Sequence, residues 1–204
     1  MMPAVVSPTL LFTRDGQSLL LRGVTEDDAK GLTAFYRSLD QHTDRMFFIL
    51  AEFGEDVAAD MSRLHASGCE MHLVVEGPEG DIIGHLSMQP FPAVCPRLGI
   101  CLKQGWQGRG LGRRMMEIAL DLAESVAGCT GVWLSVLEDN RPAIALYESL
   151  AFRRVRTRLV RRKYSRYRRN RGAFRLVDMV LMFPQPENGA PLTGDLPVAP
   201  TDRT

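Results

Sequence analysis

The sequence predicts one α/β domain, in which apolar strands alternate with amphipathic helices along the chain. Short apolar runs bounded by Gly, Pro, Asn or Asp are typical of strands, and such runs recur between residues 9 and 183. Between them, four longer segments carry apolar residues at helical spacing. The chain has 204 residues, of which 45% are hydrophobic and 24% charged, which suits one globular domain with an adequate core.

The first half of the chain reads as two strands, two helices and a hairpin. A turn at Asp15-Gly16 separates the first two strands, and a capping-box pattern at Thr25 begins the first helix. Gly77 to Gly80 forms the turn of the hairpin. The predicted elements are strands 9–12 and 18–22, helices 25–39 and 56–66, and strands 71–76 and 81–89. Residues 40–54 are predicted to form a loop or a short helix.

The second half begins with a strand and ends in a polar tail. Its predicted elements are strand 98–102, helix 111–127, strand 132–137, helix 141–150, and strands 154–160 and 174–183. From Pro184 onward, five prolines in 21 residues and little apolar content predict disorder. The predicted organisation is an N-terminal extension over 1–17 with an optional extra strand, a domain over 18–183, and a tail over 184–204.

A glycine-rich turn, Gln107-Gly-Arg-Gly-Leu-Gly112, joins strand 98–102 to helix 111–127. This layout points unpaired backbone N–H groups and the positive end of a helix at an anion, and glycine lets the backbone approach it closely. A P-loop and the dinucleotide fingerprint both fail, because Arg113 and Met115 stand where their motif residues should be. The turn therefore predicts a phosphate site, although an ordinary helix–strand connection has the same pattern.

A second motif follows strand 132–137 and reads Asn140-Arg-Pro-Ala-Ile-Ala-Leu-Tyr147-Glu-Ser-Leu-Ala151-Phe152. Together the two motifs resemble the signatures of the GNAT superfamily of acyl-CoA N-acyltransferases, a Gln/Arg-x-x-Gly-x-Gly/Ala pyrophosphate loop and an Asn-x-x-Ala-x-x-Leu-Tyr-x-x-x-Gly-Phe segment. Ala151 replaces the usual glycine, so we expect the helix to end in a different cap. The resemblance covers about residues 19–183 and implies a mixed central sheet flanked by helices on both faces.

The resemblance implies acetyl-CoA as cosubstrate. The sheet should open between strands 98–102 and 132–137, and the strand backbone should line the pantetheine arm, while the loop amides take the pyrophosphate. Asn140 should hydrogen-bond the arm near the thioester, and Tyr147 should lie close to the sulfur and act as general acid; the alternative for Tyr147 is a packing role. The residues assigned to acetyl-CoA are Ile100, Cys101, Leu102, Gln107, Gly108, Arg109, Gly110, Leu111, Gly112, Arg113, Asn140 and Tyr147.

The general base is harder to assign. An unperturbed lysine (pKa ~10.4) is neutral about once in a few thousand molecules at pH 7, whereas an α-amine (pKa ~8) is neutral about a tenth of the time. Lysine-acetylating members often carry a carboxylate on the strand that corresponds to 98–102, and residues 93–102 contain none. The candidates are Glu138 at the end of strand 132–137, which ranks first, and His85, which is more often a core group in a strand; a water relay is an equal alternative to Glu138.

Three further short patterns resemble one subfamily of the GNAT superfamily. Asp15-Gly16 before Leu21-Arg22, Arg45-Met-Phe-Phe48, and Trp106 before the loop are similar to the acyltransferase domain of bacterial protein lysine acetyltransferases. The missing carboxylate argues against carrying over the protein-lysine substrate.

The segment Arg153–Arg171 is strongly basic. Its ten Arg and one Lys, without an acid, carry +11, so the rest of a chain whose net charge is +1 carries −10. Arginines alternate with apolar residues over 154–160, which predicts one charged and one inward face. The segment is a charged edge strand, a partner for the protein's own acids such as the 117–124 stripe, or a site for an anion. The excess of Arg over Lys favours carboxylate or phosphate contacts.

These observations predict an N-acetyltransferase that moves an acetyl group from acetyl-CoA to a primary amine by direct attack. The acceptor would be an acidic small molecule or protein segment. The alternative is a non-catalytic acyl-CoA sensor, or a nucleic-acid-associated module that uses Arg153–Arg171. The four cysteines lack metal-ligand spacing, and the chain shows no membrane span or signal peptide. We therefore expect a cytoplasmic protein with reduced thiols and no metal, and leave a homodimer open.

Overall fold

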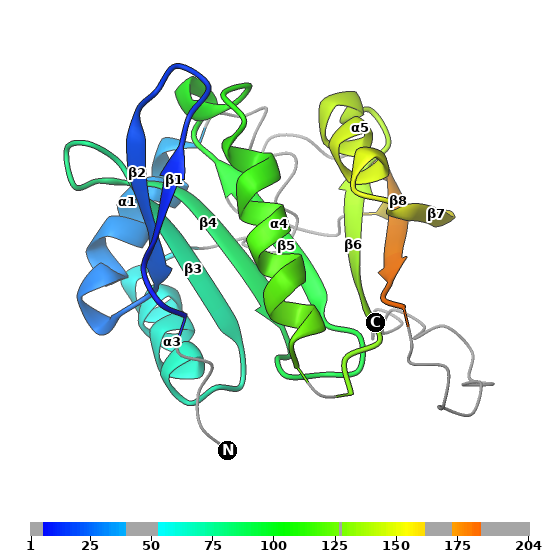
Figure 1. The fold of residues 1–204 in the computed structure, drawn as a ribbon, viewed down its shortest axis with the longest axis horizontal. Coiled ribbons are helices and arrows are strands. Elements are labelled where there is room, and N and C mark those ends of the chain that lie inside the picture. The colour runs from blue at the N-terminus through cyan, green and yellow to red at the C-terminus, as the bar shows by residue number, and fades with distance from the viewer. Residues whose placement is uncertain (1–5, 40–52, 127, 162–172, 185–204) are drawn as a thin grey trace.

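The computed structural model describes residues 6–39, 53–126, 128–161 and 173–184. They form one eight-stranded sheet in the order β1-β2-β3-β4-β5-β6-β8-β7 (Figure 1). The strands are β1 Thr9–Phe12, β2 Ser18–Gly23, β3 Met71–Glu76, β4 Ile82–Gln89, β5 Arg97–Leu102, β6 Gly131–Leu137, β7 Arg153–Arg161 and β8 Ala173–Met182. The helices are α1 Ala29–Ser38, α3 Glu55–Ala66, α4 Leu111–Glu124 and α5 Arg141–Ser149, with 3-10 turns η1 Glu26–Asp28 and η2 Gln104–Trp106.

The sheet is mixed, as predicted, because one of its neighbouring pairs is parallel. All other neighbours run antiparallel, whereas β5 and β6 run parallel and share a single paired position, Arg97 opposite Trp133. That position lies at the first residue of β5. The two strands therefore touch where they begin and separate toward their carboxyl ends.

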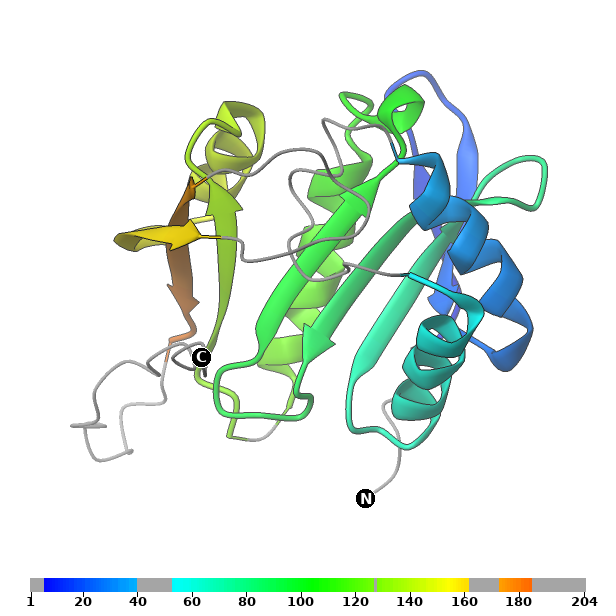
Figure 2. The ribbon, with the colours of Figure 1, turned by 180° about the vertical axis from the view of Figure 1, so that it is seen from behind.

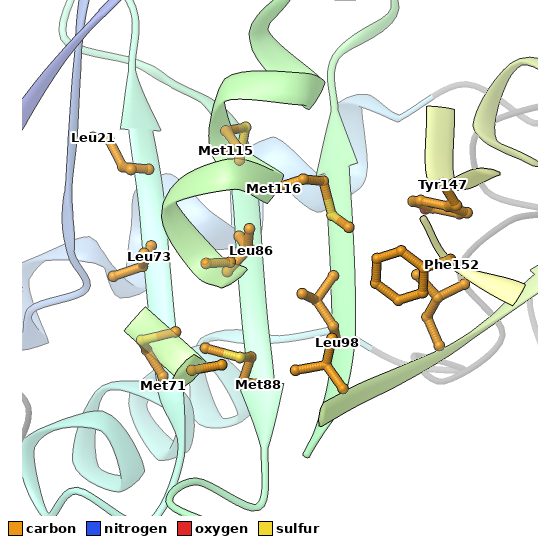
Figure 3. Close-up of a cluster of buried hydrophobic side chains, with 14 of the residues drawn as sticks. Leu21, Met71, Leu73, Leu86, Met88, Leu98, Met115, Met116, Tyr147 and Phe152 are labelled. Carbon is orange, nitrogen blue, oxygen red and sulfur yellow. The ribbon is translucent and has the colours of Figure 1, made fainter. Parts of the chain in front are cut away.

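Helices cover both faces of the sheet, which confirms the predicted layers. On one face, α4 and α5 pack on the larger apolar cluster, to which Met115, Met116 and Tyr147 contribute (Figure 3). On the other face, α1 and α3 pack on a smaller cluster that includes Phe35 and Cys101 (Figure 2). The strand period of two explains the division, since successive side chains point to opposite faces.

One edge of the sheet agrees with the sequence prediction and the other does not. β1 is the extra strand that was predicted as optional in the N-terminal extension, and the side chain of Leu11 packs in the core. At the other edge, the inward face predicted for β7 is wrong, because Val155 and Leu159 are 46% and 59% exposed. β7 pairs with β8 alone and carries a bulge between Arg154 and Arg156, so alternation along it does not translate into a buried side.

The end of α5 also corrects an expectation. Ala151 adopts φ 66°, the left-handed conformation that glycine usually supplies at this position. The Phe152 N–H bonds the carbonyl of Tyr147 and the Ala151 N–H bonds that of Glu148, each at 3.0 Å. This is a Schellman cap, so the cap is of the glycine type although the residue is alanine.

Candidate active site

The glycine-rich loop delivers the chain into α4 through two left-handed residues. Gly108 and Gly110 have φ of 75° and 89°, and Gly110 is the N-cap of the helix. The N–H of Arg114 bonds the carbonyl of Gly110 at 3.3 Å, so the N–H groups before it lie ahead of the intrahelical ladder. A Cβ at Gly108 would meet nothing within 4 Å. The loop is thus open and electropositive, which fits a pyrophosphate group.

The β1–β2 turn supports this loop, which the sequence did not reveal. The N–H of Arg14 donates to the carbonyl of Arg109 at 3.0 Å. The Arg109 side chain bonds Gln17 at 3.1 Å, pairs with Asp15 at 3.3 Å, and lies 4.8 Å over the Trp106 ring. The Arg109 side chain therefore holds the glycine-rich loop against the β1–β2 turn.

β5 and β6 separate beside the loop past the position at which they pair, and this gap in the strand pairing is named the slot. The predicted lining residues Ile100, Cys101 and Leu102 occupy the carboxyl half of β5, past the one position that pairs with β6. The side chain of Gln107 donates to the carbonyl of Leu102 at 3.0 Å and so ties the loop to the end of the strand. The structure brings these predicted cofactor residues together along one path.

Tyr147 reaches this path from α5. It is buried and packs against Phe152 with ring centroids 5.9 Å apart (Figure 3). Burial, and then the nearby Cys101 thiol, raise the pKa of Tyr147 above its ordinary value. The phenol is therefore protonated at neutral pH, which a proton donor requires.

Asn140 begins the same helix. Its side-chain oxygen accepts a hydrogen bond from the N–H of Ala143 at 3.2 Å, which caps the helix N-terminus. The predicted contact of Asn140 with a pantetheine arm stays a prediction.

Two other predicted residues are tied to protein groups. Arg113 donates to Ser149 Oγ at 2.5 Å and so links α4 to α5. Glu138 lies just after β6, where its carboxylate pairs with Arg175 at 2.8 Å and its N–H bonds the Arg175 carbonyl. The Glu138 side chain is 45% exposed.

The basic segment is described only in part, because residues 162–172 and the Arg161 side chain lie outside the described structure. Asp178 on β8 pairs with Arg156 at 2.7 Å and with Arg158 at 3.1 Å, and Glu148 pairs with Arg154 at 2.8 Å. Arg154, Arg156 and Arg158 thus pair with acids of α5 and β8. Glu117, one of the acids on α4 that were considered as partners for the basic segment, pairs instead with Arg113 and Arg114 of its own helix.

The described residues also bear on metal ligands, membrane-spanning helices and cysteines. Among the described residues, no group of three or more His, Cys, Asp and Glu side chains is placed to hold a metal ion. None of the helices described is both long and apolar enough to cross a membrane. All four cysteines are free thiols: Cys101 and Cys129 are buried, Cys95 is partly buried and Cys69 is exposed. The Arg45–Phe48 pattern and the predicted tail beyond Pro184 lie outside the described residues.

Comparisons with known proteins agree with this geometry. The model of the acetyltransferase (GNAT) family matches residues 32–152, which is more than half of the chain. The chain is 34% identical over 101 residues to N-alpha-acetyltransferase RimI of Mycobacterium tuberculosis, covering 47% of this chain and 58% of that protein. It is 42% identical over 65 residues to the [ribosomal protein bS18]-alanine N-acetyltransferase of Salmonella typhimurium, covering 32% and 41%.

A solved structure shows the same fold. The ribosomal-protein-S5-alanine acetyltransferase of Vibrio fischeri superposes with a TM-score of 0.69 at 16% identity, covering 87% of this chain and 97% of that one. The chain spans about half the length of the curated relatives that it matches. The match to the family model, together with the loop and the slot, establishes that this chain belongs to the GNAT family of acetyltransferases.

Proposed function

We propose that the protein is an N-acetyltransferase that moves an acetyl group from acetyl-CoA to a primary amine by direct attack. The observation that carries the proposal is the slot: β5 and β6 pair at one position only, beside a helix that begins at a left-handed Gly110. An extended arm fits between separated strands, and its phosphates fit the start of α4. Bound acetyl-CoA would supply an activated thioester.

The chain's own residues have distinct roles in this proposal. The backbone of Ile100 to Leu102 binds the arm, and the amides of Gln107 to Gly112 bind the pyrophosphate, with Arg113 at its side. Asn140 orients the arm through its side-chain amide. Tyr147 holds a proton on its buried phenol and gives it to the leaving sulfur, because its raised pKa keeps it protonated.

The acceptor that suits this site best is an α-amine, on an amino acid or at the N-terminus of a peptide. Two relatives are named as an N-alpha-acetyltransferase and as an alanine N-acetyltransferase of a ribosomal protein. An α-amine (pKa ~8) is neutral about a tenth of the time at pH 7 and so needs less help from a base than lysine does. Residues 93–102, which border the slot, contain no carboxylate.

Glu138 stays the predicted base for the acceptor. Its position after β6 places it at the same end of the sheet as the opening of the slot. Its ion pair with Arg175 engages one of its two carboxylate oxygens. A Glu138→Gln variant tests this role.

A panel of amines tests the proposed function. Purified protein is mixed with acetyl-CoA and with alanine-initiated peptides, free amino acids, an N-blocked lysine peptide or spermidine, and thiol release is followed. We expect steady release of CoA with α-amines and little with the lysine peptide. Binding of acetyl-CoA without turnover of any amine would contradict the proposal and favour an acyl-CoA sensor.

A further inference from the structure

Side chains from α1, β4, β3 and the residue before β3 form one continuous hydrogen-bonded chain, named here the Tyr36–Glu70 chain. The Tyr36 hydroxyl lies 2.7 Å from His85 Nδ1, and His85 Nε2 lies 3.1 Å from His72 Nδ1. His72 Nε2 lies 2.8 Å from the carboxylate of Glu70. Tyr36 and both histidines are buried, whereas the Glu70 side chain is 25% exposed. The chain thus runs from the interior to the surface.

With both rings neutral, the direction of every hydrogen bond in the chain follows from its last member. A carboxylate only accepts, so His72 donates from Nε2 to Glu70 and accepts at Nδ1. His85 must then donate from Nε2 and accept at Nδ1, which leaves the Tyr36 hydroxyl as the donor to His85. Each proton in the chain therefore points from Tyr36 toward Glu70. Such an aligned chain conducts a proton without moving any heavy atom.

The inner end of the chain lies beside the proposed acetyl-transfer site. His85 on β4 is paired in register with Cys101 on β5, one of the residues proposed to line the arm. Burial, followed by the Cys101 thiol, raises the pKa of Tyr36, and the same two causes raise the pKa of Tyr147. Both phenols are thus close enough to sense one thiol. Tyr36 packs in the cluster under α1, and Tyr147 packs in the cluster under α4.

Other ionisable groups around the chain favour neutral rings. Burial, and next the charge of neighbouring His72, lower the pKa of His85 well below its ordinary value. His65 on α3 accepts the His72 backbone N–H at 3.2 Å, and burial lowers its pKa as well. Arg97 on β5 is close enough to Glu70 to interact with its charge. A stable imidazolium is therefore disfavoured at His85, whose neutral ring passes a proton on rather than keeping it.

We propose that the Tyr36–Glu70 chain is a proton relay that takes one proton from the acceptor ammonium and carries it to the protein surface. The inference rests on the proposed N-acetyltransferase function. The ammonium proton moves to the Tyr36 oxygen as the phenolic proton moves to His85. The protons on the Nε2 atoms of His85 and His72 each shift one place outward, and Glu70 holds the last proton as a carboxylic acid while the product forms. After product release Glu70 returns this proton along the chain, and Tyr36 gives one proton to water, which restores the starting tautomers and the carboxylate.

The relay predicts a characteristic dependence on pH. Without it, the enzyme must use the fraction of α-amine that is already neutral, about a tenth at pH 7 and nearly all of it above about pH 9. Tyr36→Phe and Glu70→Gln should therefore each lower kcat/KM for an alanine-initiated tetrapeptide about tenfold at pH 7. At pH 9.5 both variants should approach the wild type. Glu70→Gln is the safer variant, because Glu70 is partly exposed and glutamine can still accept from His72.

A matched control separates the relay from simple packing. Gln89 lies 3.5 Å from His72 Nε2 but is not a member of the chain, so Gln89→Leu should leave the pH profile of kcat/KM unchanged. NMR of the ring nitrogens in the protein without substrates should show both histidines neutral and protonated at Nε2. This second readout does not depend on turnover.

Three outcomes would overturn the relay. Equal losses of kcat/KM at pH 7 and 9.5, with a lower Tm, would make the chain a structural network. A pH-dependent loss in Glu138→Gln alone would assign the base to Glu138. The opposite tautomer in either ring would break the direction of transfer. If the wild type turns over none of the amines, the proposed function itself fails, and the role of the relay fails with it.

Discussion

Arg14 donates its backbone N–H to the carbonyl oxygen of Arg109 at 3.0 Å, and this bond joins the β1–β2 turn to the glycine-rich loop. The side chain of Arg14 also lies against Gly110, since a Cβ built there would be 3.4 Å from Arg14 Cγ. The turn therefore fixes the loop from one side, while Gln107 fixes it to β5 from the other. A cradle held at both ends should bind phosphates with little rearrangement.

Gly110→Asp should abolish binding of CoA without unfolding the protein. Aspartate tolerates the left-handed conformation better than most residues and can cap a helix, so α4 should still form. Its carboxylate would, however, repel the phosphates by about 4 kcal/mol for unit charges 4 Å apart at an effective dielectric of ~20. Titration calorimetry with CoA measures the loss.

Gly105→Asp is the matched control for this variant. Gly105 lies in η2 just before the loop, and a Cβ there meets nothing within 4 Å. It adds the same charge but not at the helix N-cap. If both variants bind CoA like the wild type, the loop is not the phosphate site.

Tyr147→Phe should lower kcat by roughly 10²-fold or more, because the variant lacks the proposed general acid. The affinity for CoA should hardly change, since the ring still packs against Phe152. Steady-state kinetics and calorimetry separate the two effects. An unchanged kcat would assign Tyr147 to packing in the cluster between α4 and α5.

The sequence indicated the parts of the candidate site that belong to local motifs, but not the contacts between residues far apart in the chain. The loop and the Asn140 to Phe152 segment are continuous in sequence, so their residue types alone indicated where the slot would lie. The chain from Tyr36 to Glu70 depends on strand register, which includes a shift between Val75 and Glu76 that the sequence does not reveal. The contacts of the Arg109 side chain join residues far apart in the chain.

Two errors show where simple patterns fail. Alternation along β7 predicted an inward face, but alternation specifies a buried side only when something packs on it, and Val155 remains exposed. The loss of glycine at Ala151 predicted a different cap, but the hydrogen bonds to Tyr147 and Glu148 hold alanine in the left-handed conformation. In both cases tertiary context outweighed local preference.

Ala151→Gly should therefore stabilise the protein by about 1 kcal/mol, because glycine adopts φ 66° without the cost of about 1–2 kcal/mol that alanine bears. Ala145→Gly is the control. Ala145 is exposed within α5, where glycine should destabilise by about 1 kcal/mol. Urea unfolding of both variants measures the two free energies. A destabilised Ala151→Gly variant would mean that the Schellman geometry costs alanine little here.

Asp178 should dominate the acid sensitivity of the β7–β8 edge. Burial opposes ionisation of Asp178, but hydrogen bonds from Ser135 and Arg156 and the charge of Arg158 outweigh it, so its pKa lies below the ordinary value. A carboxyl with a lowered pKa contributes stability above its unfolded pKa of ~3.9, and this contribution disappears as the pH falls through the folded pKa. The stabilisation should thus be complete at pH 5–7 and lost below about pH 4.

Asp178→Asn should consequently destabilise the protein by about 1–3 kcal/mol at pH 7, because charge-assisted bonds are lost and two arginines remain side by side. Asp81→Asn is the control: Asp81 pairs with Lys103 at 2.6 Å but is 44% exposed, so its loss should cost less than about 1 kcal/mol. Thermal melts at pH 7 and pH 3 measure both. The gap between Asp178→Asn and the wild type should narrow from pH 7 to pH 3. A gap of the same size at both pH values would show that Asp178 acts through packing rather than charge.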